Sequence, residues 1–362
     1  MDGLLPVITL LMATATLIAA LTLVAVKLAH RIILVGRGVR SAIYIAALGE
    51  MIATKLLPSH MPRQWARDRL FHQAIIDYRR LLSGEDGEFV DELIKRSKVL
   101  PSLRRCIQPP WLNAIRLRAI GSYVELASQQ EIPHLRSLLT DRNEFVRFHA
   151  AHGLGRLGDV ASVPLILDLC VRVRAWEVAK LADSLPLFGR EAVYPICRWI
   201  DLAWQSPNST EQAVAEAART LGLIGDLDAE MTLLELLESD RREWRIAAAS
   251  ALGRIGSDSS RFALLRALRN ESWEVRARSV RALAYLADGS VAPIVSGLLS
   301  DSQWWVRQNA AETLGELPGG VVELTKALES EDHFAADAAR NQLAELRLLP
   351  AGVSPRLSVE TQ

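Results

Sequence analysis

Two histidines in the middle of the sequence have a spacing that could bind a metal ion. His149 and His152 are three residues apart, so on a helix their side chains share one face. In related segments of the chain, however, these positions hold arginine, asparagine, serine or glutamate, which are typical of an exposed helix face. The sequence offers no third ligand at a fixed spacing from the pair. We therefore expect two solvated histidines and no metal site.

A glycine string beside these histidines matches the pattern of dinucleotide-binding loops. It reads Gly153-Leu-Gly155-Arg-Leu-Gly158. A phosphate-binding loop of this kind must follow a strand and begin a helix. This string instead closes a helical segment, and Gly253 and Gly256 repeat it at the end of another. We interpret it as a helix end, where glycine permits a left-handed residue and close packing.

The sequence gives no other support for catalysis. We find no nucleophile paired with a base, no isolated pair of carboxylates and no cluster of metal ligands in the sequence pattern. The three cysteines, Cys106, Cys170 and Cys197, form no Cys-x-x-Cys motif, and their odd number is typical of reduced, buried thiols. We predict that the chain is not an enzyme and binds no cofactor.

Arginines recur in a fixed phase that could form a row of anion-binding groups. They are Arg245, Arg276 and Arg307, which follow one another at a constant interval. An alternative is that each arginine pairs with an aspartate in the turn before its helix. Asp301 stands six residues before Arg307, but Asn270 takes that place before Arg276. We expect the row to be structural, with Arg276 the member most available to a partner.

Tryptophan is frequent in a chain with few other aromatic residues. The chain has nine, and several cluster with Phe145 where successive helices begin. These are Trp176, Trp244, Trp273, Trp304 and Trp305. They could simply pack against the next repeat, or they could form an aromatic ridge that binds a partner protein. Trp304 and Trp305 point about 100° apart on a helix, so we expect them to be unequally buried and one of them to contact the partner.

These residues belong to a unit that is written several times along the chain. LGRIG at Leu252–Gly256, LAYLA at Leu283–Ala287 and LGELP at Leu314–Pro318 are separated by the same interval as the arginines, which we call the repeat period. About eight such units fit between residues 100 and 349, each predicted as two antiparallel helices. In one unit the predicted apolar positions are Phe262, Leu265 and Leu268 on the first helix and Val275, Val280, Leu283 and Leu286 on the second. The sequence thus predicts an all-α fold, a right-handed α-solenoid whose core forms only between neighbouring units.

The unit resembles HEAT repeats, in particular the short subclass of phycobilisome-lyase-like proteins. The resemblance is carried by an aspartate, a Val-Arg pair and a Leu-Gly pair in fixed order. They are matched by Asp141, Val146-Arg147 and Leu154-Gly155, and again by Asp301, Val306-Arg307 and Leu314-Gly315. The resemblance implies a surface for binding other proteins. It also implies a second possibility, because some HEAT-fold proteins excise damaged bases and the lyase relatives handle bilins.

The amino terminus is typical of a membrane anchor. Leu4–Val26 contains 23 residues without a charge, enough to cross a hydrocarbon core of about 30 Å. Basic residues follow directly: Lys27, His30, Arg31, Arg37 and Arg40. The positive-inside rule then predicts one span within residues 1–31, an outside amino terminus and a cytoplasmic remainder at the cell (inner) membrane. This simple layout suggests a bacterial origin.

The segments that flank the predicted solenoid serve other purposes. Residues 32–62 form a basic stem, in which Ile32–Leu57 either lies along the inner leaflet against anionic lipid head groups or packs on the solenoid. Residues 63–99 form a helical amino-terminal cap, with a turn at Gly84–Gly87, and residues 350–362 form a disordered tail.

Charge is divided unequally along the chain. Residues 1–118 contain 17 Lys and Arg against 9 Asp and Glu, whereas residues 119–362 contain 25 against 33. An acidic solenoid disfavours nucleic acid as a partner. We therefore predict a membrane-tethered scaffold whose cytoplasmic solenoid binds and positions or regulates another, membrane-associated protein. The alternative is a HEAT-fold enzyme or nucleic-acid binder.

Overall fold

The computed structural model describes residues 36–58, 61–108, 113–205 and 211–349, and every regular element in these ranges is a helix. The all-α prediction is therefore confirmed for this part of the chain. The predicted span Leu4–Val26 and the predicted tail 350–362 lie outside the described residues. Within the described residues, no helix combines the length and the apolar character that crossing a membrane requires.

The chain forms two compact units, Met1–Ala127 and Ser128–Gln362. In the first unit the helices are residues 36–54, α2 (Arg69–Leu81), α3 (Gly84–Arg96), α4 (Val99–Ile107) and α5 (Asn113–Leu126), with the 3₁₀ turn η1 (Trp65–Arg67) before α2. The helix α3 already begins at Gly84, so the predicted turn at Gly84–Gly87 is wrong. The first predicted repeat, α4 with α5, belongs to this unit, one helix pair beyond the predicted end of the cap.

The helix of residues 36–54 packs on the first unit through one face. Tyr44, Leu48 and Ile52 are buried at helical spacing. The ring of Tyr44 contacts Trp65 and Phe71 edge-on, with centroids 5.3 and 5.5 Å away. Its hydroxyl also donates a 2.8 Å hydrogen bond to Asp68, the residue that caps α2. These contacts fix the helix at the start of the unit.

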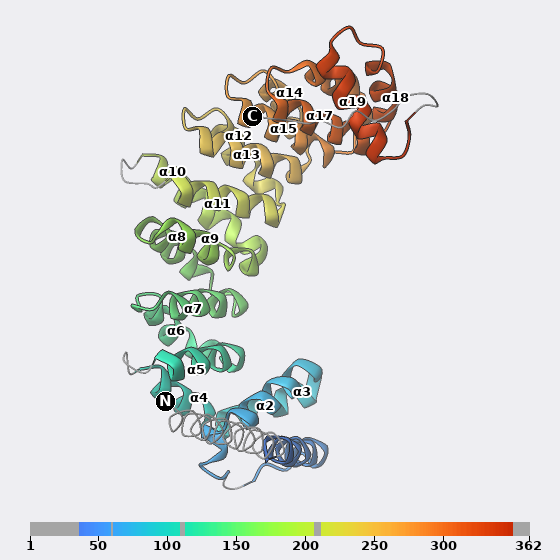
Figure 1. Ribbon diagram of the computed structural model, residues 1–362. Coiled ribbons are helices and arrows are strands. Elements are labelled where there is room, and N and C mark those ends of the chain that lie inside the picture. The colour runs from blue at the N-terminus through green and yellow to red at the C-terminus, as the bar shows by residue number, and fades with distance from the viewer. Residues whose placement is uncertain (1–35, 59–60, 109–112, 206–210, 350–362) are drawn as a thin grey trace, which may run out of the picture. The chain divides into compact units, whose positions relative to one another are not determined.

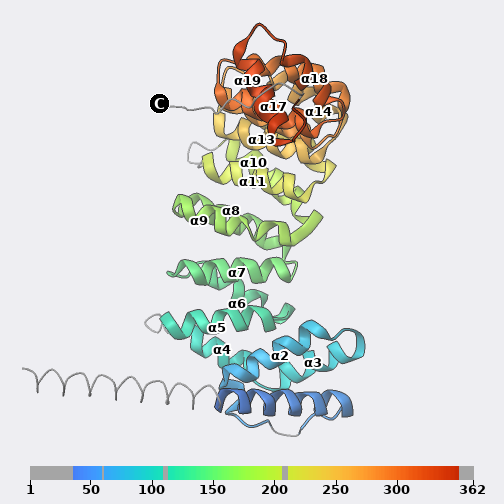
Figure 2. The ribbon, with the colours of Figure 1, turned by 45° about the vertical axis from the view of Figure 1, so that its right-hand side comes forward.

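The second unit is a stack of helix pairs (Figures 1 and 2). The first helices of the pairs are α6 (Ile132–Leu138), α8 (Val163–Arg172), α10 (Val193–Trp204), α12 (Glu230–Leu237), α14 (Asp258–Ala267), α16 (Ala292–Ser296) and α18 (Gly320–Ala327). The second helices are α7 (Glu144–Arg156), α9 (Ala175–Ala182), α11 (Glu211–Ile224), α13 (Arg242–Ile255), α15 (Trp273–Ala284), α17 (Trp304–Glu316) and α19 (His333–Glu345). Each second helix packs on the next second helix, from α7 to α19. The predicted solenoid of stacked pairs is therefore present.

Short 3₁₀ turns connect the pairs. They are η2 (Gln129–Glu131), η3 (Val160–Ser162), η4 (Leu185–Ala192), η5 (Leu227–Ala229) and η6 (Gly289–Val291), each before a first helix, and η7 (Gly297–Ser300) after α16. Several second helices are followed by a glycine with a positive φ, among them α11, which is followed by Gly225. Gly256 ends α13 with a φ of +73°, and Gly158 follows α7 with a φ of +67°. The glycine string is thus a helix end, as interpreted from the sequence.

One predicted core position proves to be on the surface. Phe262 is 65% exposed, whereas Leu264 and Leu268 of the same segment are buried. The first helix must contact both its own second helix and the neighbouring first helix, α12. Its buried stripe therefore follows Leu264 and Leu268, four residues apart, and leaves Phe262 outside.

Candidate partner-binding surfaces

The phased arginines fasten each second helix to the turn before it. In each, Nη1 donates to two backbone carbonyls, six and five residues earlier. The distances are 2.8 and 3.2 Å for Arg147, 3.0 and 3.3 Å for Arg245, 2.9 and 3.1 Å for Arg276, and 2.8 and 3.2 Å for Arg307. These carbonyls follow the first helix, where backbone acceptors lack helical partners. The row therefore has a structural role inside each repeat.

Three of these arginines also reach the next repeat. Arg276 donates from Nε and Nη2 to the two carboxylate oxygens of Asp301, at 2.7 and 2.8 Å. Burial opposes ionisation of this carboxylate, but the hydrogen bonds from Arg276 and from the Gln303 N–H, together with the charges of Arg276 and Arg307, lower the pKa of Asp301 overall. Arg147 pairs with Glu177 through Nη2 and a single carboxylate oxygen, and Arg245 lies 3.5 Å from Glu271.

The prediction that Arg276 is the arginine most available to a partner is wrong. Its own turn carries Asn270 instead of an aspartate, but the carboxylate of the following turn takes that place. The side chain of Arg276 is only 15% exposed, and its guanidinium is already bound on both sides. The sequence spacing within one unit could not reveal a partner that lies in the next.

Trp244 is also incorrectly placed by the sequence analysis, because it is 1% exposed. Trp244 stands immediately before its helix arginine, and valine fills that position in other second helices. Those valines are Val146, Val275 and Val306, and all are fully buried. The indole of Trp244 packs against Trp204 at 5.2 Å and donates to the Glu211 carbonyl at 3.2 Å. It is a core residue and cannot contact a partner.

Other aromatic side chains at the same helix starts are exposed, and we call them the aromatic edge. They are between 40 and 55% exposed: Phe145, Trp176, Trp304, Trp305 and Phe334. Trp273 is intermediate in burial. Trp304 and Trp305 contact one another edge-on at 4.6 Å, and both are exposed, so the expected contrast in burial between them is small.

A pocket of about 390 Å³ opens on this edge between α7 and α9. The Lys180 ammonium lies 5.2 Å from the Phe145 ring and 5.1 Å from the Trp176 ring, so it contacts both aromatic faces. Phe148 and His149 also line the pocket. Glu144, Glu177 and Asp183 line it as well, so the pocket offers aromatic faces for an apolar side chain, with charges of both signs around them. Among the described residues, no three histidine, cysteine or acidic side chains come together as metal ligands.

A second surface runs along the first helices and was missed by the sequence analysis. One apolar residue on each of six successive first helices is between 47 and 71% exposed. They are Leu165, Tyr194, Met231, Phe262, Ile294 and Val322, and we call them the apolar row. Met231 and Phe262 are separated by the same interval as Arg245 and Arg276, which is the repeat period. That spacing could have identified the row, but apolar residues that recur with the repeat period were assigned to the core.

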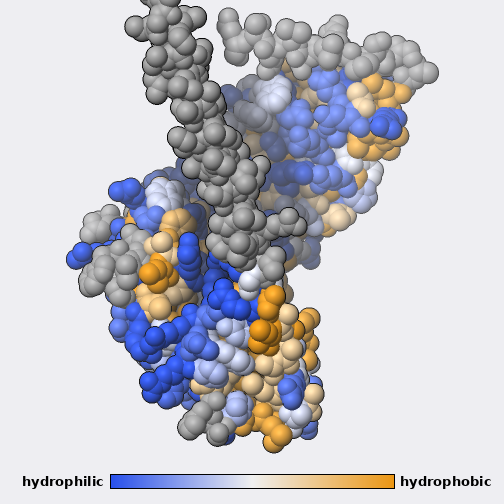
Figure 3. All heavy atoms as spheres, turned by 60° about the horizontal axis from the view of Figure 1, so that its bottom comes forward, coloured by the Kyte–Doolittle hydropathy of each residue, from blue (hydrophilic) through white to orange (hydrophobic). Residues whose placement is uncertain are grey.

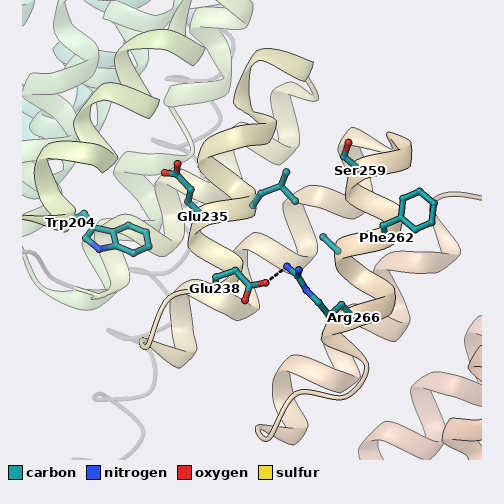
Figure 4. A pocket seen from close by; sticks show the side chains of 8 residues that line it. Trp204, Glu235, Glu238, Ser259, Phe262 and Arg266 are labelled. Atoms are coloured by element: carbon teal, nitrogen blue, oxygen red, sulfur yellow. Dashed lines mark hydrogen bonds and ion pairs between the residues drawn. The ribbon is translucent and has the colours of Figure 1, made fainter.

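The apolar row borders an open pocket of about 770 Å³ (Figure 4). Trp204 and Phe262 stand on opposite sides of it, and Leu234 and Ala263 also line it. An ion pair between Glu238 and Arg266 closes one side. Apolar walls with a few charged groups are typical of a site for a partner's side chains.

Comparison with known proteins places the fold. Residues 94–185, 199–271 and 261–345 match the family of HEAT repeats. A search of curated proteins finds no match. Solved structures that resemble the chain include an engineered protein (18% identity, 84% of this chain and 88% of that one, TM-score 0.38). Human deoxyhypusine hydroxylase in complex with glycerol is also similar (16% identity, 73% and 99%, TM-score 0.31), as is Kap121p bound to Nup53p (15%, 78% and 37%, TM-score 0.44).

The match to the family agrees with the structure repeat by repeat. The matched segments cover more than half of the chain and include α4 to α19 almost completely. The stacked pairs and the carbonyl-binding arginines account for the residues that recur with the repeat period. The chain therefore belongs to the family of HEAT-repeat proteins.

Proposed function

We propose that this protein is a membrane-tethered scaffold whose repeats bind and position another, membrane-associated protein. The observation that carries the proposal is the aromatic edge, because groups of large apolar side chains that remain exposed mark sites of interaction with other proteins. Tryptophan is also the residue most enriched among those that dominate binding energy. The protein supplies a surface and no chemistry of its own. The motif described above further favours the short, phycobilisome-lyase-like subclass of the family.

The helix of residues 36–54 supports the membrane part of the proposal. Tyr44 and Leu48 face the first unit, but Val39 and Ile43, one helical turn apart, are about half exposed on the remaining surface. An apolar face beside basic residues is typical of a helix that lies in a membrane interface. Figure 3 shows hydrophobic and hydrophilic side chains gathered in separate areas of the face it presents. Packing on the unit and lying on the inner leaflet are thus compatible.

The same reasoning supports the proposed location. With Leu4–Val26 as a single span and the basic residues after it inside, the repeats face the cytoplasm of a bacterial cell. Anionic lipid head groups would then lie against the stem. A HEAT-fold enzyme or nucleic-acid binder remains the alternative, and it has less support because the repeats are acidic.

The test is affinity purification of the full chain from detergent-solubilised membranes, with mass spectrometry of the bound proteins. The edge variant is Trp304→Ala/Trp305→Ala, and the row variant Met231→Ala/Phe262→Ala serves as its matched control. We expect a stoichiometric membrane partner that the edge variant loses and the row variant retains. Loss in the row variant alone would move the binding site to the apolar row. A wild-type protein that retains no partner at low salt would contradict the scaffold.

A further inference from the structure

A pocket on the amino-terminal unit is lined by five basic side chains and, among its lining residues, no carboxylate. Its volume is about 760 Å³, which suits a small molecule or a lipid head group. The basic residues are Arg63, Arg67, Arg96, Lys98 and Arg105. They come from η1 and the segment before it, from the end of α3 and from α4, which pack together in this unit.

Most of this charge has no ion-pair partner within the described part of the chain. Arg63, Arg67 and Lys98 make no ion pair with another described residue. Arg96 is bound to Glu92 at 2.9 Å only through Nε, and Arg105 donates from Nε to the Pro101 carbonyl at 3.3 Å. Both guanidinium groups therefore retain Nη donors. Like charges held around one cavity repel each other, and an anion in the cavity removes that repulsion.

The backbone adds to the positive potential. Lys98 precedes α4 in a left-handed conformation, with a φ of 57°, and its own side chain does not cap the helix. Of the first N–H groups of α4, Val99 donates to the Ser97 hydroxyl at 3.4 Å. Ser97 and Ser102, on either side of it, also line the pocket. The first turn of a helix carries a partial positive charge, so here it reinforces the basic side chains.

A neighbouring depression extends the basic surface. It shares Arg63 and Arg67 with the pocket and adds Arg40 and Arg69. Its single carboxylate, Asp68, is already bound by the Tyr44 hydroxyl at 2.8 Å and by Arg40 at 3.4 Å. The basic side chains of the pocket and the depression therefore carry more unpaired positive charge than a ligand with one carboxylate would neutralise.

We propose that this pocket binds a phosphate group with two or more negative charges, such as a phosphomonoester or a pyrophosphate. Guanidinium groups match phosphate oxygens in charge and in bidentate geometry. The ligand can be the head group of a phospholipid or a soluble phosphorylated compound, because both present the same group. The inference does not rest on the aromatic edge or on a protein partner.

The experiment uses the purified full chain in a non-ionic detergent and titration calorimetry. One arm uses inorganic pyrophosphate, and the other uses micelles with phosphatidic acid against micelles with phosphatidylcholine. The pocket variant is Arg67→Gln/Lys98→Gln. The control variant is Arg80→Gln/Lys95→Gln, which removes the same charge from exposed residues of this unit that pair with Glu125 and Glu92. Arg63→Gln alone replaces the pocket variant if circular dichroism shows that the double variant is unfolded.

We expect the pocket variant to bind about tenfold or more weakly and the control variant to bind within about threefold of wild type. If the pocket variant binds both pyrophosphate and phosphatidic acid micelles more weakly than wild type, the site is assigned to a lipid head group. If only its binding of pyrophosphate is weakened, the site is assigned to a soluble ligand. Wild-type protein that binds neither probe overturns the inference, as does an equal loss in the control variant. Because no partner protein takes part, either result leaves the scaffold to be judged separately.

Discussion

Gly253 of α13 lies directly against Ala282 of α15, one repeat further along the chain. A Cβ placed on Gly253 would stand 2.7 Å from both the Cβ and the carbonyl oxygen of Ala282, and 2.9 Å from its Cα. Two helix backbones can approach so closely only where one residue lacks a side chain. Gly222 meets Ala251 in the same way, so the Leu-Gly pair of the motif sets the spacing between repeats.

Replacing Gly253 with alanine should therefore destabilise the protein. Overpacking against backbone typically costs about 1–3 kcal/mol, which exceeds the gain in helix propensity of about 1 kcal/mol. The matched control is Gly121→Ala in α5, because no atom lies within 4 Å of its added Cβ. In urea denaturation, the free energy of unfolding should fall for Gly253→Ala and rise for Gly121→Ala. Two stabilised variants would mean that the helices separate without cost.

Ala287 offers the reverse change. It occupies the helix-end position that Gly256 fills one repeat earlier, and its φ is +49°. A left-handed alanine is strained by about 1–2 kcal/mol, part of which the greater chain entropy of glycine cancels. Ala287→Gly should raise the free energy of unfolding by about 0.5–1 kcal/mol. Gly256→Ala should lower it by a similar amount, and the idea fails if both changes act in the same direction.

The pair of Arg276 and Asp301 should matter more than an exposed ion pair. Arg276→Gln removes the charge that balances a carboxylate whose side chain is 7% exposed, so we expect a loss of about 2–3 kcal/mol. Arg266→Gln is the control, because Arg266 and Glu238 are 70 and 61% exposed and such pairs contribute less than about 1 kcal/mol. If Arg276→Gln and Arg266→Gln lost the same amount of stability in thermal or urea denaturation, the structural role of the arginine row would be contradicted.

Asp301 should also make stability depend on acid pH. Its pKa is lower in the folded protein than in the unfolded chain, so its contribution is complete above its ordinary pKa of about 4. The contribution is lost as pH falls through the folded value. The stability difference between wild type and Asp301→Asn should therefore shrink as pH falls below about 4. Asp258→Asn, at an exposed aspartate, is the control in the same denaturation series.

Tryptophans should separate into two classes by their effect on folding. Trp244→Ala leaves a large cavity beside Trp204 and should cost about 3–5 kcal/mol. Trp305→Ala removes an exposed ring and should change stability by less than about 1 kcal/mol. Denaturant midpoints of the two purified variants check this. A strongly destabilised Trp305 variant would make the aromatic edge a packing feature.

The architecture was predictable because neighbouring repeats impose the sequence period. Leu-Gly pairs, helix arginines and alanines recur at one interval, because each repeat closes its own turn with an arginine and packs a glycine against an alanine of the next repeat. Which side chains remain exposed was less predictable. Trp244 and Trp304 both stand near a helix start, but a shift of two positions relative to the arginine places one in the core and the other on the surface.

The candidate sites were hard to predict for a related reason. The partner of Arg276 lies 25 residues away in the following turn, and spacing within one unit does not show it. The apolar row was hidden because Phe262 fits an inward helical pattern as well as an outward one. The basic pocket combines two separate segments, within residues 58–67 and 96–105, whose approach depends on tertiary packing of the first unit.

The apolar row also restricts the shape of anything that binds along it. Its members sit on successive first helices, and packed helices are about 8–10 Å apart. Seven residues of an α-helix advance about 10.5 Å, and three residues of an extended strand advance about 10 Å. A ligand helix that touches consecutive members would therefore carry apolar residues every seven positions, and an extended segment every three. The spacing between the repeats would thus determine the sequence period of any ligand that bound along the apolar row.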